Sequence, residues 1–225
     1  MTDFQDIRAC VFDAYGTLFD IHSPTARLAD RLGDKAQAIS DLWRAKQLQY
    51  SLLRSLMRVH ADFWQVTGDA LDYALGVFEV QDPELRERLM ELYLSLEAYR
   101  DAVPALEQLA GDNRRCAILS NGAPAMLQAS VENAGLAQLL EAVISVEDAG
   151  IYKPAPQVYQ LAVDRMGVAK ENICFVSSNA WDVAGAAQFG LQVAHLNRFG
   201  QPIENIPGKP KAVITDLGQL PGLLN

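Results

Sequence analysis

Short apolar segments that do not alternate with polar residues recur along the chain, and they constrain its fold more than any other feature. Such segments are typical of strands covered on both faces of a sheet. They lie at residues 9–12, 116–119, 142–145, 173–176, 192–195 and, more weakly, 212–214. Helical stretches separate most of them, at about residues 124–134, 156–166 and 181–189. This alternation predicts an α/β fold with a parallel sheet and right-handed crossovers.

One long interval departs from this alternation. Residues 17–103 contain no strand-like segment, and amphipathic helical stretches take their place at about 34–57, 60–67, 71–78 and 83–95. Open α/β sheets bind ligands at the carboxyl ends of their strands, so a helical insertion after the first strand would cover a site there. We therefore expect an α/β core domain of residues 1–17 and 99–225 and a helical cap domain of residues 18–98.

Charge and cysteine content exclude several classes of protein. Among 225 residues there are 19 Lys and Arg against 28 Asp and Glu, a net charge of −9, which argues against nucleic acid as a partner. No apolar segment reaches the ~18 residues of a membrane span, and the N-terminus lacks the features of a signal peptide. Cys10, Cys116 and Cys174 are odd in number and lie in apolar segments, as is typical of free thiols in a reducing compartment. We expect a cytoplasmic protein without a membrane partner.

Polar side chains follow four of the predicted strands. Asp13 comes after the first, Ser120 and Asn121 after the second, Lys153 after the third and Asp182 after the fourth. Each group alone is well explained as a turn residue, a helix start or a solvated loop lysine. Four such groups at the same end of successive strands predict instead a catalytic site on loops held by a rigid scaffold.

These residues resemble the motifs of the haloacid dehalogenase superfamily. The four motifs are residues 13–17, Ser120-Asn121, Lys153-Pro154 and residues 177–182, in the order of that family. The helical interval lies where the family carries its cap. The resemblance covers the whole chain and implies a Rossmann-like parallel core with an inserted helical cap.

Two positions depart from the pattern of the phosphatases in that superfamily. Tyr15 stands where a phosphatase has its general-acid Asp, and Ser177-Ser178 replaces the Gly-Asp pair whose Asp binds magnesium. Asp13 and Asp182 alone would coordinate magnesium poorly, so we expect no metal and no other cofactor. These departures, with the cap stretch 43–50, resemble the L-2-haloacid dehalogenase branch.

That resemblance implies a covalent mechanism. Asp13 would attack the halogen-bearing carbon of a short L-2-haloalkanoic acid, release halide and form an ester that water hydrolyses to a D-2-hydroxy acid. Because a halide needs no proton to leave, Tyr15 can replace the general acid. Lys153 would keep Asp13 ionised, and Asp182 would orient Lys153 and help position or activate the water. The side chains that would hydrogen-bond Asp13 or the water are Thr17, Ser177 and Asn179.

The resemblance also implies which residues bind the substrate and the halide. Ser120, with nearby backbone N–H groups, would hold the substrate carboxylate. The departing halide would be received by Arg44, Asn121 and Trp181. The other residues implied in substrate binding are Ala14, Tyr15, Leu48, Phe63 and Tyr159. Most of these have simpler explanations, since Arg44 could extend along the surface and Leu48, Phe63, Tyr159 and Trp181 could be packing residues.

Two other functions stay open at this point. A magnesium-dependent phosphatase is opposed by Tyr15 and Ser178. A catalytically idle binding protein on the same fold is opposed by the retained charges of Asp13, Lys153 and Asp182, which are costly to bury. A homodimer is plausible, because the cap carries Leu52, Leu53, Leu56 and Met57, although their spacing fits an internal core face equally well.

Overall fold

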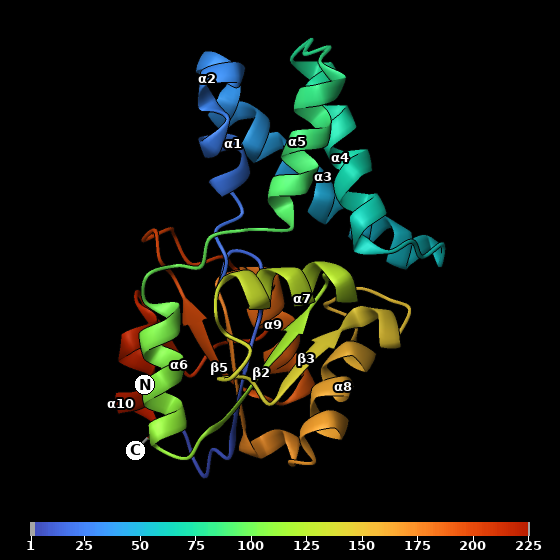
Figure 1. Ribbon diagram of the computed structural model, residues 1–225. Helices are drawn as coiled ribbons and strands as arrows, with labels where there is room; N and C mark the ends of the chain where they lie inside the picture. Colours follow the sequence, from blue (N-terminus) through green and yellow to red (C-terminus); the bar gives the residue numbers. More distant parts are fainter. Residues whose placement is uncertain (1–2, 225) are drawn as a thin grey trace.

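A six-stranded parallel sheet forms the centre of the molecule (Figure 1), in a computed structural model that describes residues 3–224. The strand order is β3-β2-β1-β4-β5-β6, and every neighbouring pair runs parallel. The strands are β1 Ala9–Phe12, β2 Arg115–Ser120, β3 Ala142–Ser145, β4 Ile173–Ser177, β5 Gln192–Leu196 and β6 Ala212–Ile214. All six lie where the apolar segments predict them, and the parallel α/β fold is confirmed.

Helices cover both faces of this sheet (Figure 1). One layer is formed by α6, α7 and α10, and the opposite layer by α8 and α9, as right-handed crossovers on either side of β1 require. Their bounds are α6 Ala102–Gly111, α7 Pro124–Asn133, α8 Pro156–Met166, α9 Ala180–Phe189 and α10 Leu220–Leu223, with short 3-10 turns at Val146–Asp148, Lys170–Asn172 and Leu217–Gln219. Because β1 lies between β2 and β4 under both layers, its four residues are fully buried.

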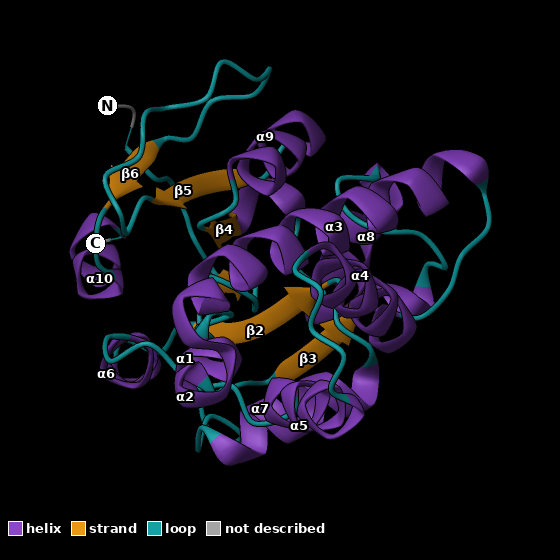
Figure 2. Cartoon of the chain, turned by 90° about the horizontal axis from the view of Figure 1, so that it is seen from above, coloured by secondary structure: helices purple, strands orange, loops and turns teal. Residues whose placement is uncertain are grey.

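Five further helices lie beyond the carboxyl ends of the strands and form the cap (Figures 1 and 2). They are α1 Ser23–Arg27, α2 Ala29–Leu32, α3 Ala36–Met57, α4 Phe63–Val77 and α5 Pro83–Tyr93, with a 3-10 turn at Gly33–Lys35. The side chains of Asp62 and Asp82 accept hydrogen bonds from backbone N–H groups in the first turns of α4 and α5, so both helices begin where the sequence provides a cap. In residues 3–224 no helix has the length and apolar character needed to cross a membrane.

The prediction of two separate helices at 60–67 and 71–78 is wrong. Gly68 lies inside the continuous helix α4, where a Cβ would come 3.0 Å from an Arg86 nitrogen of α5, so the glycine allows the two helices to approach closely. The short helices α1 and α2 and the core helix α6 were not predicted. Pro104 in α6 resembles a helix breaker, but it stands in the first turn, where the missing N–H has no partner to lose.

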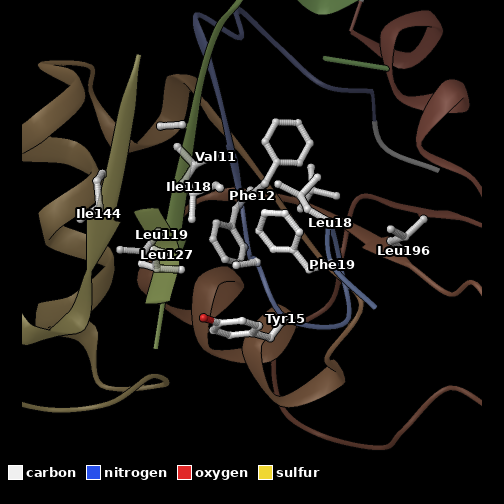
Figure 3. Packing of buried hydrophobic residues seen from close by; sticks show 14 of the residues in the cluster. Val11, Phe12, Tyr15, Leu18, Phe19, Ile118, Leu119, Leu127, Ile144 and Leu196 are labelled. Atoms are coloured by element: carbon white, nitrogen blue, oxygen red, sulfur yellow. The ribbon is translucent and has the colours of Figure 1, made fainter. Parts of the chain in front are cut away.

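The two chain segments that connect cap and core run side by side. Tyr99 N donates to Leu18 O at 2.9 Å, Asp20 N donates to Glu97 O at 2.8 Å, and Phe19 bridges Ala98. Figure 3 shows Phe12, Leu18 and Phe19 packed close to one another, with Tyr15 just beyond them. The hydrophobic core therefore continues from the sheet into the base of the cap.

Candidate active site

Asp13 lies at the carboxyl end of the central strand. Its backbone N–H donates to Val176 O at 2.9 Å, so the ladder between β1 and β4 continues one residue past the strand. The chain then turns sharply, with the N–H groups of Thr17, Leu18 and Phe19 donating to the carbonyl of Ala14. This turn directs the Asp13 side chain beyond the sheet edge, and the residue is only 5% exposed.

The two oxygens of Asp13 have different surroundings. Oδ1 lies 3.1 Å from Lys153 Nζ. Oδ2 accepts hydrogen bonds from Asn179 Nδ2 at 2.7 Å, from Thr17 Oγ1 at 3.2 Å and from Ser177 Oγ at 3.4 Å. Of the predicted catalytic residues, the structure thus brings Thr17, Lys153, Ser177 and Asn179 directly to the carboxylate. One oxygen faces a cation and the other faces three neutral donors.

Asp182 lies behind Lys153 rather than beside Asp13. It is in the first turn of α9 and fully buried, and its Oδ2 lies 2.9 Å from Lys153 Nζ. Tyr159 of α8 donates to Asp182 Oδ1 at 2.8 Å. Tyr159 was expected to contact the substrate or to be a packing residue. In the structure its hydroxyl orients Asp182, and Asp182 in turn orients Lys153.

Burial changes the acidity of this chain of groups. It raises the pKa of Asp182 to about 6, although the Lys153 charge opposes the shift. For Lys153, burial alone would lower the pKa, but the two carboxylates outweigh that effect and raise it above its ordinary value. Burial also raises the pKa of Tyr159, which keeps its proton to donate. The Lys153 ammonium group thus lies between the carboxyl groups of Asp13 and Asp182 and is paired with both.

The loop after β2 supports the site from its other flank. Asn121 Oδ1 accepts a hydrogen bond from Lys153 N at 3.0 Å, which ties this loop to the loop after β3. Ser120 is fully buried, and its Oγ accepts from Gly122 N at 3.1 Å. In this structure Asn121 positions the backbone of Lys153, and Ser120 shapes the turn; neither side chain hydrogen-bonds Asp13.

The cap adds a cation and an aromatic wall. Arg44 of α3 donates through Nη2 to Asn179 Oδ1 at 3.2 Å and to Tyr15 O at 3.4 Å, so it lies beside a residue that holds Asp13. The Tyr15 ring stacks on Phe63 with centroids 5.7 Å apart. A cavity of about 640 Å³ between α3 and the core is lined by residues that include Leu48, Lys153 and Trp181. Asp13, Arg44 and Phe63 are not among the residues that line this cavity; Arg44 reaches the site through Asn179, and Phe63 through the ring of Tyr15.

Four residues that support the site were not among the predicted site residues. Ser178 donates through its N–H to Thr17 Oγ1 at 2.9 Å and through its hydroxyl to Gly16 O at 2.7 Å. Gly16 has φ +87°, and a Cβ there would lie 3.3 Å from Ser178 Oγ. Gln47 accepts a hydrogen bond from Arg44, and the Tyr93 ring packs against the Tyr15 ring. Ser178 and Gln47 fall inside the two motifs that carry the resemblance, and that is the signal that could have found them.

The side chains present do not fit a magnesium site. Residues 3–224 contain no group of three or more His, Cys, Asp or Glu side chains placed to hold a metal ion. Lys153 Nζ lies between the carboxylates of Asp13 and Asp182, where a bound cation would have to share their charge. Magnesium prefers near-octahedral oxygen ligands, and an ammonium group in that position offers none.

The fold and these side chains define the class of protein. The chain belongs to the haloacid dehalogenase-like hydrolase family, whose model matches residues 7–190. The match includes Asp13, Lys153, Asp182 and the whole of the helical cap.

Individual relatives narrow the class further. (S)-2-haloacid dehalogenase 4A of Burkholderia cepacia is 48% identical over 221 residues, which cover 98% of this chain and 96% of the relative. A crystallised dehalogenase in an intermediate complex is 46% identical with a TM-score of 0.96, covering 100% of this chain and 99% of its own. The L-2-haloacid dehalogenase of Xanthobacter autotrophicus, with chloropropionic acid covalently bound, is 40% identical with a TM-score of 0.91, covering 97% and 98%. The predicted L-2-haloacid dehalogenase branch is confirmed.

Proposed function

We propose that this protein is an (S)-2-haloacid dehalogenase that converts short L-2-haloalkanoic acids into D-2-hydroxy acids and halide. The observation that carries the proposal is the arrangement of Asp13, a buried carboxylate with Lys153 on one oxygen and three donors on the other. Tyr15 stands two residues later, so the site has a nucleophile without a neighbouring general acid. That combination suits a leaving group that departs as a stable anion.

In the first step Asp13 Oδ1 attacks the carbon that bears the halogen. We assign the attack to Oδ1 because Oδ2 already accepts three hydrogen bonds. The new C–O bond forms as the C–halogen bond breaks, and the halide takes the bonding electron pair. Attack from the face opposite the halogen inverts the configuration, which turns an L-haloacid into a D-product. The walls of the site exclude bulk water, and a partly desolvated carboxylate is a better nucleophile.

In the second step water attacks the carboxyl carbon of the Asp13 ester. The carbonyl oxygen is then Oδ2, so Thr17, Ser177 and Asn179 face the atom on which negative charge develops. Fixed donors aimed at such an oxygen lower the barrier to its formation. Asp182 is the candidate base for this step. It would orient Lys153 and help to position or activate the water. Collapse of the intermediate breaks the bond between the Asp13 carboxyl carbon and Oδ1, which leaves with the product and takes one proton of the water. The second proton is released, and the water oxygen remains in the restored Asp13 carboxylate.

We assign binding of the substrate and the halide to residues around Asp13 and Lys153. Arg44 and Trp181, with Asn121 on the far flank, would receive the halide, and Ser120 with the backbone N–H groups of its loop would hold the carboxylate. Leu48, Phe63, Tyr15 and Ala14 would enclose the alkyl group. Arginine suits halide binding because it stays charged and is weakly hydrated.

The test of the proposed function is halide release by purified protein after treatment with EDTA. L-2-chloropropionate should yield chloride and D-lactate, and the D isomer should not react. Asp13→Asn should lose at least about 10³-fold in turnover, because removal of a covalent nucleophile costs that much in comparable hydrolases. Hydrolysis of phosphate monoesters only when magnesium is added would favour the phosphatase alternative. No halide release under single-turnover conditions would favour the idle alternative.

We further propose a cap domain of residues 18–98 on a core of residues 1–17 and 99–225. The pairing of the two connecting segments at residues 18–20 and 97–99 supports these bounds. We also propose that the protein acts in the cytoplasm, in line with free, buried thiols at Cys10, Cys116 and Cys174. Retention of activity in a reducing buffer and loss of it on oxidation would agree with that assignment.

A homodimer is the assembly we propose. The outer face of α3 carries an apolar patch of Leu52, Leu53, Leu56 and Met57, and Leu56 and Met57 are 72% and 60% exposed. An apolar patch of this kind on one helix is typical of a protein–protein contact. Light scattering should give twice the chain mass for the wild type and the chain mass for Leu56→Asp. A monomeric wild type would contradict the proposal.

A further inference from the structure

Gln47 is a fully buried amide in the cap that no step of the mechanism uses. It lies on α3, one turn after Arg44, and is 1% exposed. Its Oε1 accepts hydrogen bonds from Arg44 Nη1 at 2.9 Å and from Tyr93 OH at 3.2 Å. Its Nε2 donates to Thr67 Oγ1 at 2.8 Å. A buried amide is costly unless its hydrogen bonds are made, and Gln47 accepts one of them from Arg44, a cap cation that reaches Asn179 in the site.

The network leaves the Gln47 amide one orientation. Thr67 Oγ1 donates its proton to Phe63 O at 2.6 Å, so toward Gln47 it can only accept. It must therefore face the amide nitrogen, and the amide oxygen must face Arg44 and Tyr93. Trp43 Nε1 donates to Thr67 O at 2.8 Å and fixes the same turn of α4. Reversing the amide would place an NH₂ group against the Arg44 guanidinium and leave Thr67 without its donor.

The Gln47 oxygen restricts the rotation of the Arg44 guanidinium about its stem. One terminal nitrogen is held by Gln47 in the cap, and the other by Asn179 and Tyr15 O in the core. A guanidinium presents its donors in a fixed fork, so holding two nitrogens determines where the rest of the group points. An amide oxygen does this without cancelling the positive charge, whereas a carboxylate in its place would pair with it.

We propose that Gln47 is a positioning residue for halide departure. It holds Arg44 in the orientation that receives the leaving halide and leaves its positive charge unpaired, an inference that rests on the proposed dehalogenase function. The same network fixes the carbonyl of Phe63, so the halide side and the alkyl wall of the site are set by one buried group. Gln47 itself touches neither substrate nor halide, and its effect passes entirely through Arg44.

The test compares chloride and bromide as leaving groups in single turnover. Chloride is the poorer leaving group and depends more on a correctly placed cation, whereas bromide depends on it less. Gln47→Met removes the acceptor, and Gln47→Glu keeps the shape but pairs the Arg44 charge with a carboxylate. Both variants should release chloride from L-2-chloropropionate about tenfold to a hundredfold more slowly, the range expected for loss of a hydrogen bond to a charged group. Bromide release from L-2-bromopropionate should slow by a smaller factor, so the bromide-to-chloride ratio rises.

Two controls separate positioning from general damage. Gln37→Met makes the same change on the exposed first turn of α3 and should leave the ratio at its wild-type value. In an Arg44→Lys background Gln47→Met should slow halide release little further, because the residue acts through Arg44. Equal slowing of chloride and bromide release would overturn the inference, and so would fully additive effects of Gln47→Met and Arg44→Lys on halide release. In both cases turnover by the wild type would still support the proposed function. No halide release by the wild type would overturn both.

Discussion

At the residue scale, Tyr159 and Asp182 set the pH range in which the site can work. Burial raises the pKa of Asp182 to about 6, and the Tyr159 hydrogen bond acts in the opposite direction by favouring the charged form. Lys153 needs a charged Asp182 to hold it, so activity should fall as pH falls through about 6. Tyr159→Phe removes the stabilising donor and should move this acid limb upward by about half a unit to one unit. The measurement is kcat/KM against pH for both proteins. An unchanged limb would mean that Asp182 does not control it.

Thr17 gives a second prediction at this scale, because the two steps use Asp13 Oδ2 differently. In the attack step Oδ2 is a spectator, and in hydrolysis it becomes the oxygen that gains charge. Thr17→Val removes one donor to it and should slow hydrolysis by about 10²-fold, with a smaller effect on halide release. The aspartyl ester should then accumulate during turnover and appear as an added mass on the intact protein. Thr17→Ser keeps the hydroxyl and should not accumulate ester; accumulation in both variants would argue against this role.

The sequence indicated the acidic, basic and amide groups of the site but not how they are linked. Asp13, Lys153 and Asp182 follow strands of a parallel sheet, and that topology alone predicts their meeting. The role of Ser178 depends on its contact with Thr17, which lies 161 residues away in the sequence. The role of Gln47 depends on how α3 packs against Thr67 of α4. Asn121 and Ser120 were expected at the substrate, yet their hydrogen bonds are to backbone groups. Residue type and spacing do not determine which of several polar partners a side chain takes.

At the element scale, the strands were predictable and some helices were not. A strand buried on both faces is apolar throughout, so β1 and β4 are visible from composition alone. Helices α4 and α6 contain Gly68 and Pro104, residues that usually mark an end, and only their surroundings explain why the helix continues. Gly68 faces α5, and Pro104 lies in an N-terminal turn. For Gly68 the contact with α5 decides, and for Pro104 the position of the helix start decides; residue type alone gives neither.

Helix α9 provides the prediction at this scale. A Cβ at Gly185 would lie 2.5 Å from Tyr159 OH and 2.6 Å from Pro154 Cβ, whereas a Cβ at Gly76 in α4 has no such neighbour within 4 Å. Gly76→Ala should therefore stabilise the protein by up to about 1 kcal/mol, the ordinary gain in helix propensity. Gly185→Ala should instead destabilise it by about 1–3 kcal/mol through overpacking, and should lower activity by moving Tyr159 from Asp182. Thermal unfolding of the two variants measures the contrast, and equal shifts would contradict it.

At the scale of the whole molecule, a net charge of −9 would repel an anionic substrate if it acted at the site. The exterior charge belongs to the solvated surface, and the site has its own balance of Arg44 and Lys153 against Asp13 and Asp182. Lys153 is buried between the two carboxylates, and Arg44 is half-buried where the cap helix α3 meets the core. Field from such groups extends little into solvent, so capture of a small carboxylate should be local rather than steered over long range.

The salt dependence of kcat/KM tests this separation of surface and site. Raising ionic strength shortens the Debye length from about 30 Å at 0.01 M to about 8 Å at 0.15 M, which screens the surface but hardly affects buried pairs. If the site captured substrate by long-range attraction, kcat/KM would fall steeply over this range. We expect it instead to stay level or rise slightly, because salt screens the repulsion between an acidic exterior and an anion. A salt whose anion is not a halide avoids competition at Arg44, so a steep fall in that salt would show that attraction reaches beyond the cap.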